Sequence, residues 1–283
     1  MSPSSLPEPR PAGRLKRTFI RYGIRFFVRL YLRVKFESWE NIPADPPYLL
    51  NFNHPSWVDP FLVVAFWPRR HRLFIFGPKE EDMRVGWRNR LIAWGRIGVP
   101  FKPSRSDLID TTRRATGVVK AGYVLAIAGE GRLSDREGEI VRLQEGAAFF
   151  SLRTGVPIVP LGFIGTRWVR LGKRVTMRVG PAILPGERKA NREGMDSLTA
   201  ELREAMERLL AGADDEQPPG RFARWITELF ADRPWLNEPP ATEPPPTEPP
   251  PTEPPLTEPP PTTAADSPAY VAPRDLSSNR PDD

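Results

Sequence analysis

The chain has 283 residues, long enough for one catalytic domain with tails or for two small domains. It has no cysteine, which excludes disulfides, thiolate metal ligands and cysteine nucleophiles. The net charge of +6 is unevenly placed: residues 1–36 carry +8, residues 238–283 carry −7, and the residues between them carry +5. A basic front and body predict an anionic partner, which is a membrane surface, a nucleic acid or a phosphorylated substrate.

The first segment, residues 1–14, is rich in proline and serine, and we expect it to be disordered. It is not followed by the clean apolar stretch and cleavage site of a secretory signal. No run of 18 uncharged apolar residues occurs in the sequence, so we predict no transmembrane helix.

Residues 15–37 are predicted to form an amphipathic helix. Arginine recurs at every fourth position from Arg17 to Arg33, and this spacing aligns the guanidinium groups along one side of a helix. Aromatic and aliphatic side chains fill the remaining surface, a composition typical of a helix that lies in a membrane interface. The alternative is a domain helix with solvated arginines, which leaves many aromatic side chains to be covered.

Residues 38–212 alternate short apolar runs with longer helical patterns. This alternation predicts an α/β domain with a largely parallel sheet, in which chemistry gathers beyond the carboxyl ends of the strands. Strands are expected over residues 48–52, 73–76, 98–102, 123–128, 157–163 and 174–179, and helices over 58–67, 83–97, 108–120, 145–154 and 194–210.

Residues 213–237 are predicted to be a linker with one short amphipathic helix over 222–230. In residues 238–283, Thr-Glu-Pro-Pro recurs every five residues from Thr242 to Thr257, and the segment holds 16 of the 36 prolines. Such a composition cannot form a core, so we expect a disordered, extended, acidic tail. It is either a solubilising spacer or a ligand for a proline-recognising domain.

His54 and Asp59 form the first candidate site, in Asn-Phe-Asn-His-Pro-Ser-Trp-Val-Asp-Pro at 51–60. A histidine oriented by a carboxylate can take a proton from a hydroxyl at neutral pH. Pro55 favours a turn after His54, and a helix starting near Trp57 would then bring Asp59 back toward the imidazole. These residues alone leave an alternative open, in which Asp59 caps the helix and His54 fills the loop.

A second candidate site follows the predicted strand 123–128. Two glycines flank a charged residue in Gly-Glu-Gly-Arg-Leu-Ser at 129–134, and glycine lets the backbone turn tightly and approach a ligand. Arg132 at that turn offers a fork of donors suited to phosphate. The alternative is an ordinary charged loop.

Two further segments complete the set. Lys102 and Arg105 follow a predicted strand and offer a second cation to the site. Val-Pro-Ile-Val-Pro at 156–160 predicts a buried strand that forms a wall beside the site. Its prolines, Pro157 and Pro160, disfavour a central strand paired on both sides, and simple core packing is their alternative role.

The second histidine, His71, lies in Arg-Arg-His-Arg at 69–72 and has no adjacent carboxylate. Its basic neighbours disfavour the protonated form. We therefore predict that it belongs to a basic surface patch.

The order of these four segments resembles the glycerolipid acyltransferases typified by 1-acyl-glycerol-3-phosphate acyltransferase. The resemblance spans residues 45–185 and rests on His-x4-Asp, a glycine-plus-basic segment, Glu-Gly-Arg-x-Ser and Val-Pro-Ile-Val-Pro. The family's third block usually begins Phe-Pro-Glu-Gly, whereas this chain has Ala-Gly-Glu-Gly at 128–131. The second block also departs from the family pattern, and these differences leave the acceptor open.

The resemblance implies a mixed α/β sheet and an enzyme in which His54 is the general base and Asp59 orients it. It implies transfer of an acyl chain from a CoA or acyl-carrier-protein thioester to a lysophospholipid hydroxyl, with 1-acyl-glycerol-3-phosphate as the first candidate acceptor. Glycerol-3-phosphate or another lysolipid is the alternative. No metal and no further cofactor is implied. The residues that would bind the substrate are Lys102, Arg105, Glu130, Gly131, Arg132, Ser134, Pro157 and Pro160.

With the basic helix, the resemblance predicts a peripheral enzyme on the cytoplasmic face of an anionic membrane. A membrane-binding module without catalysis is the alternative from another class of protein. It agrees with the basic front but leaves the four ordered segments unexplained. The sequence contains no recognised nucleic-acid-binding motif, so we expect no nucleic-acid partner.

Overall fold

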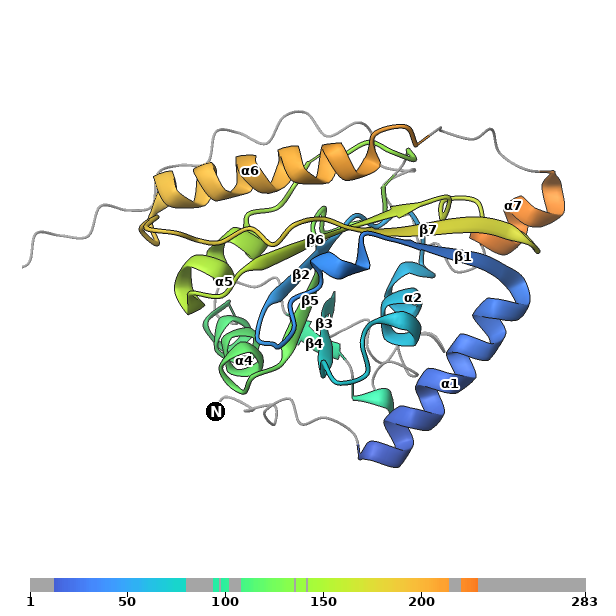
Figure 1. Ribbon diagram of the computed structural model, residues 1–283, viewed down its shortest axis with the longest axis horizontal. Coiled ribbons are helices and arrows are strands. Elements are labelled where there is room, and N and C mark those ends of the chain that lie inside the picture. Colours follow the sequence, from blue (N-terminus) through green and yellow to red (C-terminus); the bar gives the residue numbers. More distant parts are fainter. Residues whose placement is uncertain are drawn as a thin grey trace, which may run out of the picture. The chain divides into compact units, whose positions relative to one another are not determined.

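A seven-stranded β-sheet lies at the centre of the fold (Figure 1). The computed structural model describes residues 13–79, 94–96, 98–101, 108–134, 136–140, 142–213 and 220–228. The strands are β1 (Leu32–Glu37), β2 (Leu49–Phe52), β3 (Leu73–Lys79), β4 (Gly98–Phe101), β5 (Val124–Ala128), β6 (Ile158–Ile164) and β7 (Lys173–Val179).

The strand order in the sheet is β1-β7-β6-β2-β5-β3-β4. The strands from β6 to β4 run parallel to one another, whereas β7 is antiparallel to β6 and pairs with β1 in parallel. The sheet is therefore mixed and largely parallel, and the predicted α/β class is confirmed.

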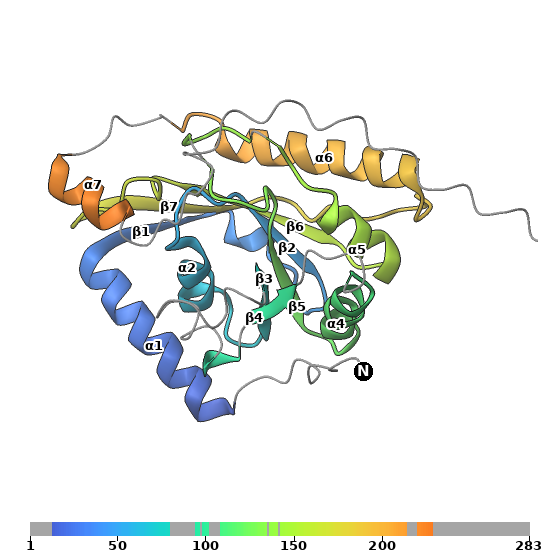
Figure 2. The same cartoon turned by 180° about the vertical axis from the view of Figure 1, so that it is seen from behind.

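Helices cover both faces of this sheet. They are α1 (Arg14–Tyr31), α2 (Asp59–Phe66), α4 (Leu108–Lys120), α5 (Gly146–Thr154), α6 (Arg192–Leu210) and α7 (Arg221–Glu228), with a short 3-10 helix at Trp39–Asn41. Figures 1 and 2 show α6 on one side of the sheet and α1 with α2 on the other. Every residue of β2 is buried because it lies between these two layers: Leu50 and Phe52 pack in the core beside α2, and Leu49 packs in the core with α5 and α6.

The first helix is shorter than predicted. It ends at Tyr31, and residues 32–37 form the edge strand β1, whose Leu32 pairs with Lys173 of β7. Leu-Arg-Val-Lys-Phe-Glu alternates apolar and charged residues, which is the period of a strand and not of a helix. The regular arginine spacing masked this change of period, so residues 32–37 belong to the sheet and not to the predicted helix.

The prolines of β6 do not place it at an edge, as the sequence suggested. The strand is paired with β2 on one side and β7 on the other. Pro160 accepts a hydrogen bond from the backbone N–H of Gly180 at 2.8 Å, so its own N atom faces the β7 side, beyond the end of β7 at Val179. The missing N–H therefore lies at the end of the β6–β7 ladder and away from the pairing with β2, so a central position is possible.

Other predicted segments are described only in part. Of the helix expected over 83–97, residues 94–96 are described, and Trp94 and Gly95 are helical. The residues from 229 onward, which include the predicted acidic tail, lie outside the described part of the chain. Among the described helices, none is both long and apolar enough to cross a bilayer.

Candidate active site

The candidate site lies where three neighbouring parallel strands end. His54 follows β2, Glu130 follows β5 and Thr166 follows β6, and parallel strands present their carboxyl ends at one edge of the sheet. The backbone N–H of Ser134 donates to the carbonyl of His54 at 2.8 Å. Segments that are far apart in the sequence are therefore joined directly at this edge.

His54 and Asp59 form a hydrogen-bonded pair. Asp59 is the first residue of α2, and its Oδ2 lies 3.0 Å from His54 Nδ1. The backbone N–H of Ser56 donates to the same oxygen at 2.8 Å, which closes the turn around Pro55. The fold-back of Asp59 toward the imidazole that the sequence predicted is confirmed, while the catalytic role of the pair stays a prediction.

The environment of the pair favours one protonation pattern. The Asp59 side chain is fully buried, whereas 18% of the His54 side chain is exposed. Burial raises the pKa of the Asp59 carboxyl, and the hydrogen bonds from His54 and the Ser56 backbone, together with the nearby Thr166 hydroxyl, oppose that rise. A carboxylate facing Nδ1 favours the proton on that nitrogen, which leaves His54 Nε2 as the atom able to accept a proton.

The turn after β5 supports the histidine loop. Ser134 Oγ donates to Glu130 Oε1, and both side chains are buried. Burial raises the pKa of the Glu130 carboxyl, and hydrogen bonds from the Ser134 side chain and the His54 backbone oppose it. Glu130 and Ser134 thus support the loop that carries His54 through contacts with the His54 backbone. Of the residues predicted to bind phosphate, Gly131 and Arg132 are the exposed pair at this turn.

Glycine is required at this turn for two reasons. A Cβ on Gly129 would lie 2.6 Å from Leu143 Cδ1 and 2.8 Å from the Asn51 side chain, closer than real Cβ atoms approach. Gly131 has a φ of +69°, in the left-handed region that disfavours other residues. The two glycines predicted to permit a tight turn therefore do so.

The two predicted prolines do not lie beside His54. Pro157 precedes β6, at the opposite end of the sheet from the site, where its carbonyl accepts from Leu49 N–H. Pro160 is buried in mid-strand and pairs with Asn51. Both prolines pack in the fold and are not a wall beside the imidazole. Lys102 and Arg105 lie outside the described residues, so their contact with phosphate stays a prediction.

Sequence reasoning missed side chains that hold the site together. Asn53 pairs with the backbone of Phe163 through both amide atoms, at 2.9 and 2.7 Å. Glu137 is buried and accepts from the backbone N–H groups of Gly165 at 2.7 Å and Arg167 at 3.0 Å. Asn53 could have been found because it sits beside His54 in the motif, whereas nothing in the sequence marks Glu137 as buried.

His71 is not part of a surface patch. It is buried, with Nδ1 2.7 Å from Tyr48 Oη and Nε2 3.0 Å from the Ala44 carbonyl. Burial lowers the pKa of its imidazole. The flanking arginines suggested an exposed position for His71, but its imidazole is buried and forms a hydrogen bond with the buried hydroxyl of Tyr48.

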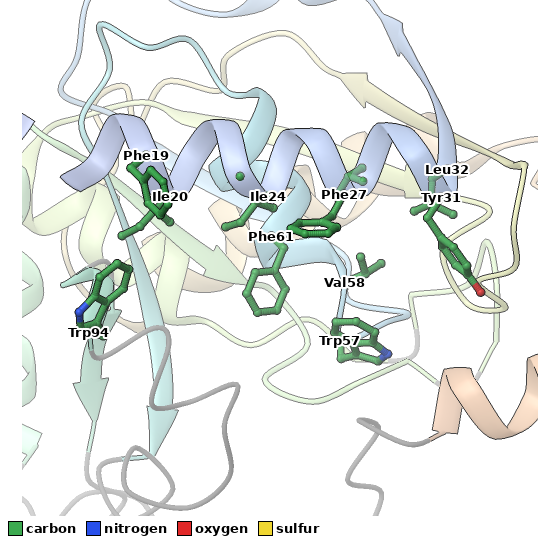
Figure 3. A pocket seen from close by; sticks show the side chains of 12 residues that line it. Phe19, Ile20, Ile24, Phe27, Tyr31, Leu32, Trp57, Val58, Phe61 and Trp94 are labelled. Atoms are coloured by element: carbon green, nitrogen blue, oxygen red, sulfur yellow. The ribbon is translucent and has the colours of Figure 1, made fainter. Parts of the chain in front are cut away.

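An apolar cavity of about 480 Å³ opens between α1, the start of α2 and Trp94 (Figure 3). From α1 it is lined by residues that include Phe19, Ile24 and Phe27, and from the α2 side by Trp57 and Phe61. Trp57 is three residues from His54 in the chain. The cavity therefore begins close to the segment that carries the imidazole.

Comparison with known proteins agrees with this fold. Residues 33–164 match the family model described as Acyltransferase. The chain is 25% identical over 137 residues to the 1-acyl-sn-glycerol-3-phosphate acyltransferase BAT2, chloroplastic, of Brassica napus. That match covers 48% of this chain and 38% of the Brassica protein.

A solved structure shares the fold. The 1-acyl-sn-glycerophosphate acyltransferase PlsC from Thermotoga maritima matches with a TM-score of 0.52 at 22% identity, over 70% of this chain and 84% of that one. The chain is similar to the acyltransferase family over residues 33–164, less than half of its length. The predicted resemblance to the glycerolipid acyltransferases of the 1-acyl-glycerol-3-phosphate type is confirmed.

Proposed function

We propose that the protein transfers a fatty acyl chain from a CoA or acyl-carrier-protein thioester to the free glycerol hydroxyl of a lysophospholipid, with 1-acyl-glycerol-3-phosphate as the first acceptor to test. The observation that carries this proposal is the hydrogen bond between His54 Nδ1 and the buried Asp59 carboxylate. The names of the Brassica and Thermotoga proteins support the choice of acceptor.

The chemistry needs one base and no covalent enzyme intermediate. His54 Nε2 takes the proton of the acceptor hydroxyl as its oxygen attacks the thioester carbonyl carbon. The new C–O ester bond forms, the C–S bond breaks, and the imidazolium returns the proton to the leaving thiolate. Asp59 stabilises the imidazolium formed in between.

The apolar cavity supports a lipid substrate. Its lining is aromatic and aliphatic, and it reaches the segment of Trp57 and Val58 beside the histidine loop (Figure 3). Burial of apolar surface contributes about 0.8 kcal/mol per methylene group. An acyl chain held there would be stabilised while its carbonyl or glycerol end faces His54.

The first helix supports a peripheral position on an anionic membrane, which we place at the cytoplasmic face. Phe19, Phe26 and Leu30 are 75%, 65% and 67% exposed. Such a row of exposed apolar side chains on a basic helix fits the headgroup boundary of a bilayer. The acceptor lipid would then reach the site from the membrane plane.

The test is an assay of the purified full chain with an acyl-CoA donor and a panel of acceptors. We expect transfer to 1-acyl-glycerol-3-phosphate to exceed transfer to a lysolipid without phosphate, because exposed Arg132 lies at the site. Faster acylation of glycerol-3-phosphate or of another lysolipid would reassign the acceptor. Vesicle binding without turnover of any acceptor, from CoA or carrier-protein donors, would favour the non-catalytic membrane module.

A further inference from the structure

The loop after β6 brings a buried hydroxyl to the His54–Asp59 pair. Thr166 has no exposed surface, and its hydroxyl acts on the Asp59 carboxyl group. Yet among the residues that the structure describes, neither Thr166 Oγ1 nor Asp59 Oδ1 has a hydrogen-bond partner of standard geometry. The Thr166 hydroxyl can donate a hydrogen bond, and the ionised Asp59 carboxylate can only accept one. These two buried oxygen atoms are therefore suited to pair with each other.

The hydrogen bonds of Asp59 leave one oxygen to be satisfied. Oδ2 already accepts from His54 Nδ1 and from the Ser56 backbone N–H. A buried acceptor such as Oδ1 destabilises the fold when it is left unpaired. A threonine hydroxyl can rotate its hydrogen toward such an oxygen.

The position of Thr166 is fixed on both sides. Its neighbours Gly165 and Arg167 donate their backbone N–H groups to the Glu137 carboxylate. Gly165 has a φ of +84°, and a Cβ there would lie 2.6 Å from the Arg174 carbonyl. A loop held this tightly keeps the Thr166 hydroxyl beside Asp59.

We propose that Thr166 is a positioning residue, whose hydroxyl donates to Asp59 Oδ1 and keeps the carboxylate ionised and directed at His54 Nδ1 while Nε2 takes the substrate proton. This inference rests on the proposed acyl transfer. Thr166 touches neither substrate nor the reacting atoms and acts only through Asp59.

The proposal predicts a shift in pH dependence with a defined sign. The charged groups around Asp59 are His54, on the loop after β2, and Glu137, on the loop after β5, which in turn faces Lys173 of β7. Without the hydroxyl, the ionised carboxylate is less stabilised, so Asp59 binds a proton at higher pH. Because the active form needs neutral His54 and ionised Asp59, the acidic limb of the kcat profile moves to higher pH.

The experiment compares Thr166→Val, which keeps the shape and removes the hydroxyl, with Thr166→Ser, which keeps the hydroxyl. We expect Thr166→Val to lower kcat about tenfold with little change in KM and to shift the acidic limb upward, corresponding to the loss of one hydrogen bond. Thr166→Ser should retain the wild-type limb and most of kcat. Thr166→Ala removes the hydroxyl by another route should the valine variant fail to fold.

Titration of the Asp59 carboxyl by carbon-13 NMR in the full chain gives a readout that needs no turnover. Asp59 should bind its proton at higher pH in Thr166→Val than in the wild type. The same shift must persist in a Glu137→Gln background, which removes the other nearby titrating carboxylate. An unchanged Asp59 titration in Thr166→Val, or Thr166→Ser as impaired as Thr166→Val, would overturn the proposal. If no acceptor is acylated by the wild-type chain, the proposed function fails while this titration still decides the role of Thr166.

Discussion

Glu137 shows how a single buried acid can serve the site at a cost in stability. Its carboxylate is 6% exposed and binds the backbone of the loop that carries Thr166. Burial raises its pKa from 4.5 to about 7, and the nearby Asp59 charge adds to the rise. A raised folded-state pKa contributes stability that is complete below the unfolded value and is lost as the pH rises through the folded value.

We therefore predict that Glu137→Gln, which cannot ionise but loses one of the two acceptor oxygens, gains stability relative to the wild type as the pH rises from 4.5 to 8. At about 1.4 kcal/mol per pKa unit, this relative gain should approach 3 kcal/mol. Denaturant unfolding at the two pH values measures it. Glu139→Gln, at an exposed neighbouring position, is the control and should show little change. A pH-independent difference between Glu137→Gln and the wild type would refute the argument.

Residues of the site were predictable from the sequence where local chain geometry decides the contact. Pro55 and the spacing from His54 to Asp59 are enough to imply the turn that the structure shows. Thr166 and Glu137 were not predictable, because their roles depend on burial and on contacts between loops after different strands. Such long-range pairings leave no mark in the local pattern.

At the scale of elements, the arginines of α1 do not all point outward toward lipid, as its amphipathic sequence pattern alone would suggest. The guanidinium groups of Arg25 and Arg29 lie over the ring of Phe66 in α2, at 5.4 and 5.8 Å. These arginines thus help to attach α1 to the domain. Phe26 remains 65% exposed and packs edge to face against Phe27.

We predict that Phe26→Ser weakens binding to anionic vesicles by about tenfold, because burying a phenylalanine in the interface contributes roughly 1.5–3 kcal/mol at most. Sedimentation with vesicles of phosphatidylglycerol and phosphatidylcholine measures the effect. Leu184→Ser removes an equally exposed apolar side chain outside α1 and serves as the matched control. Equal losses in the two variants would show that α1 is not the binding element.

The elements themselves were predicted well where hydrophobic runs were long and bounded. The parallel strands β2, β5 and β3 match their predicted ranges closely because each is an apolar run between turn signals. The boundary between α1 and β1 was wrong, since a four-residue arginine repeat continued across a change to two-residue alternation. The central place of β6 was also missed, because the effect of a proline depends on which side its N atom faces.

At the scale of the whole molecule, the fold brings a basic amphipathic helix, an apolar cavity and the His54–Asp59 pair into one domain. The cavity is lined by α1 and by the start of α2, and the same start of α2 carries Asp59 (Figure 3). The proposed membrane contact of α1 and the proposed base His54 thus lie on neighbouring parts of one structure.

The most direct measurement is the initial rate of acyl transfer from acyl-CoA to 1-acyl-glycerol-3-phosphate by the wild type and by His54→Ala, at equal vesicle-bound protein. Since a positioned general base contributes about 10²–10⁴ in rate, His54→Ala should fall by at least about a hundredfold while unfolding and vesicle binding stay unchanged. A His54→Ala variant that transfers acyl chains at the wild-type rate would contradict the account.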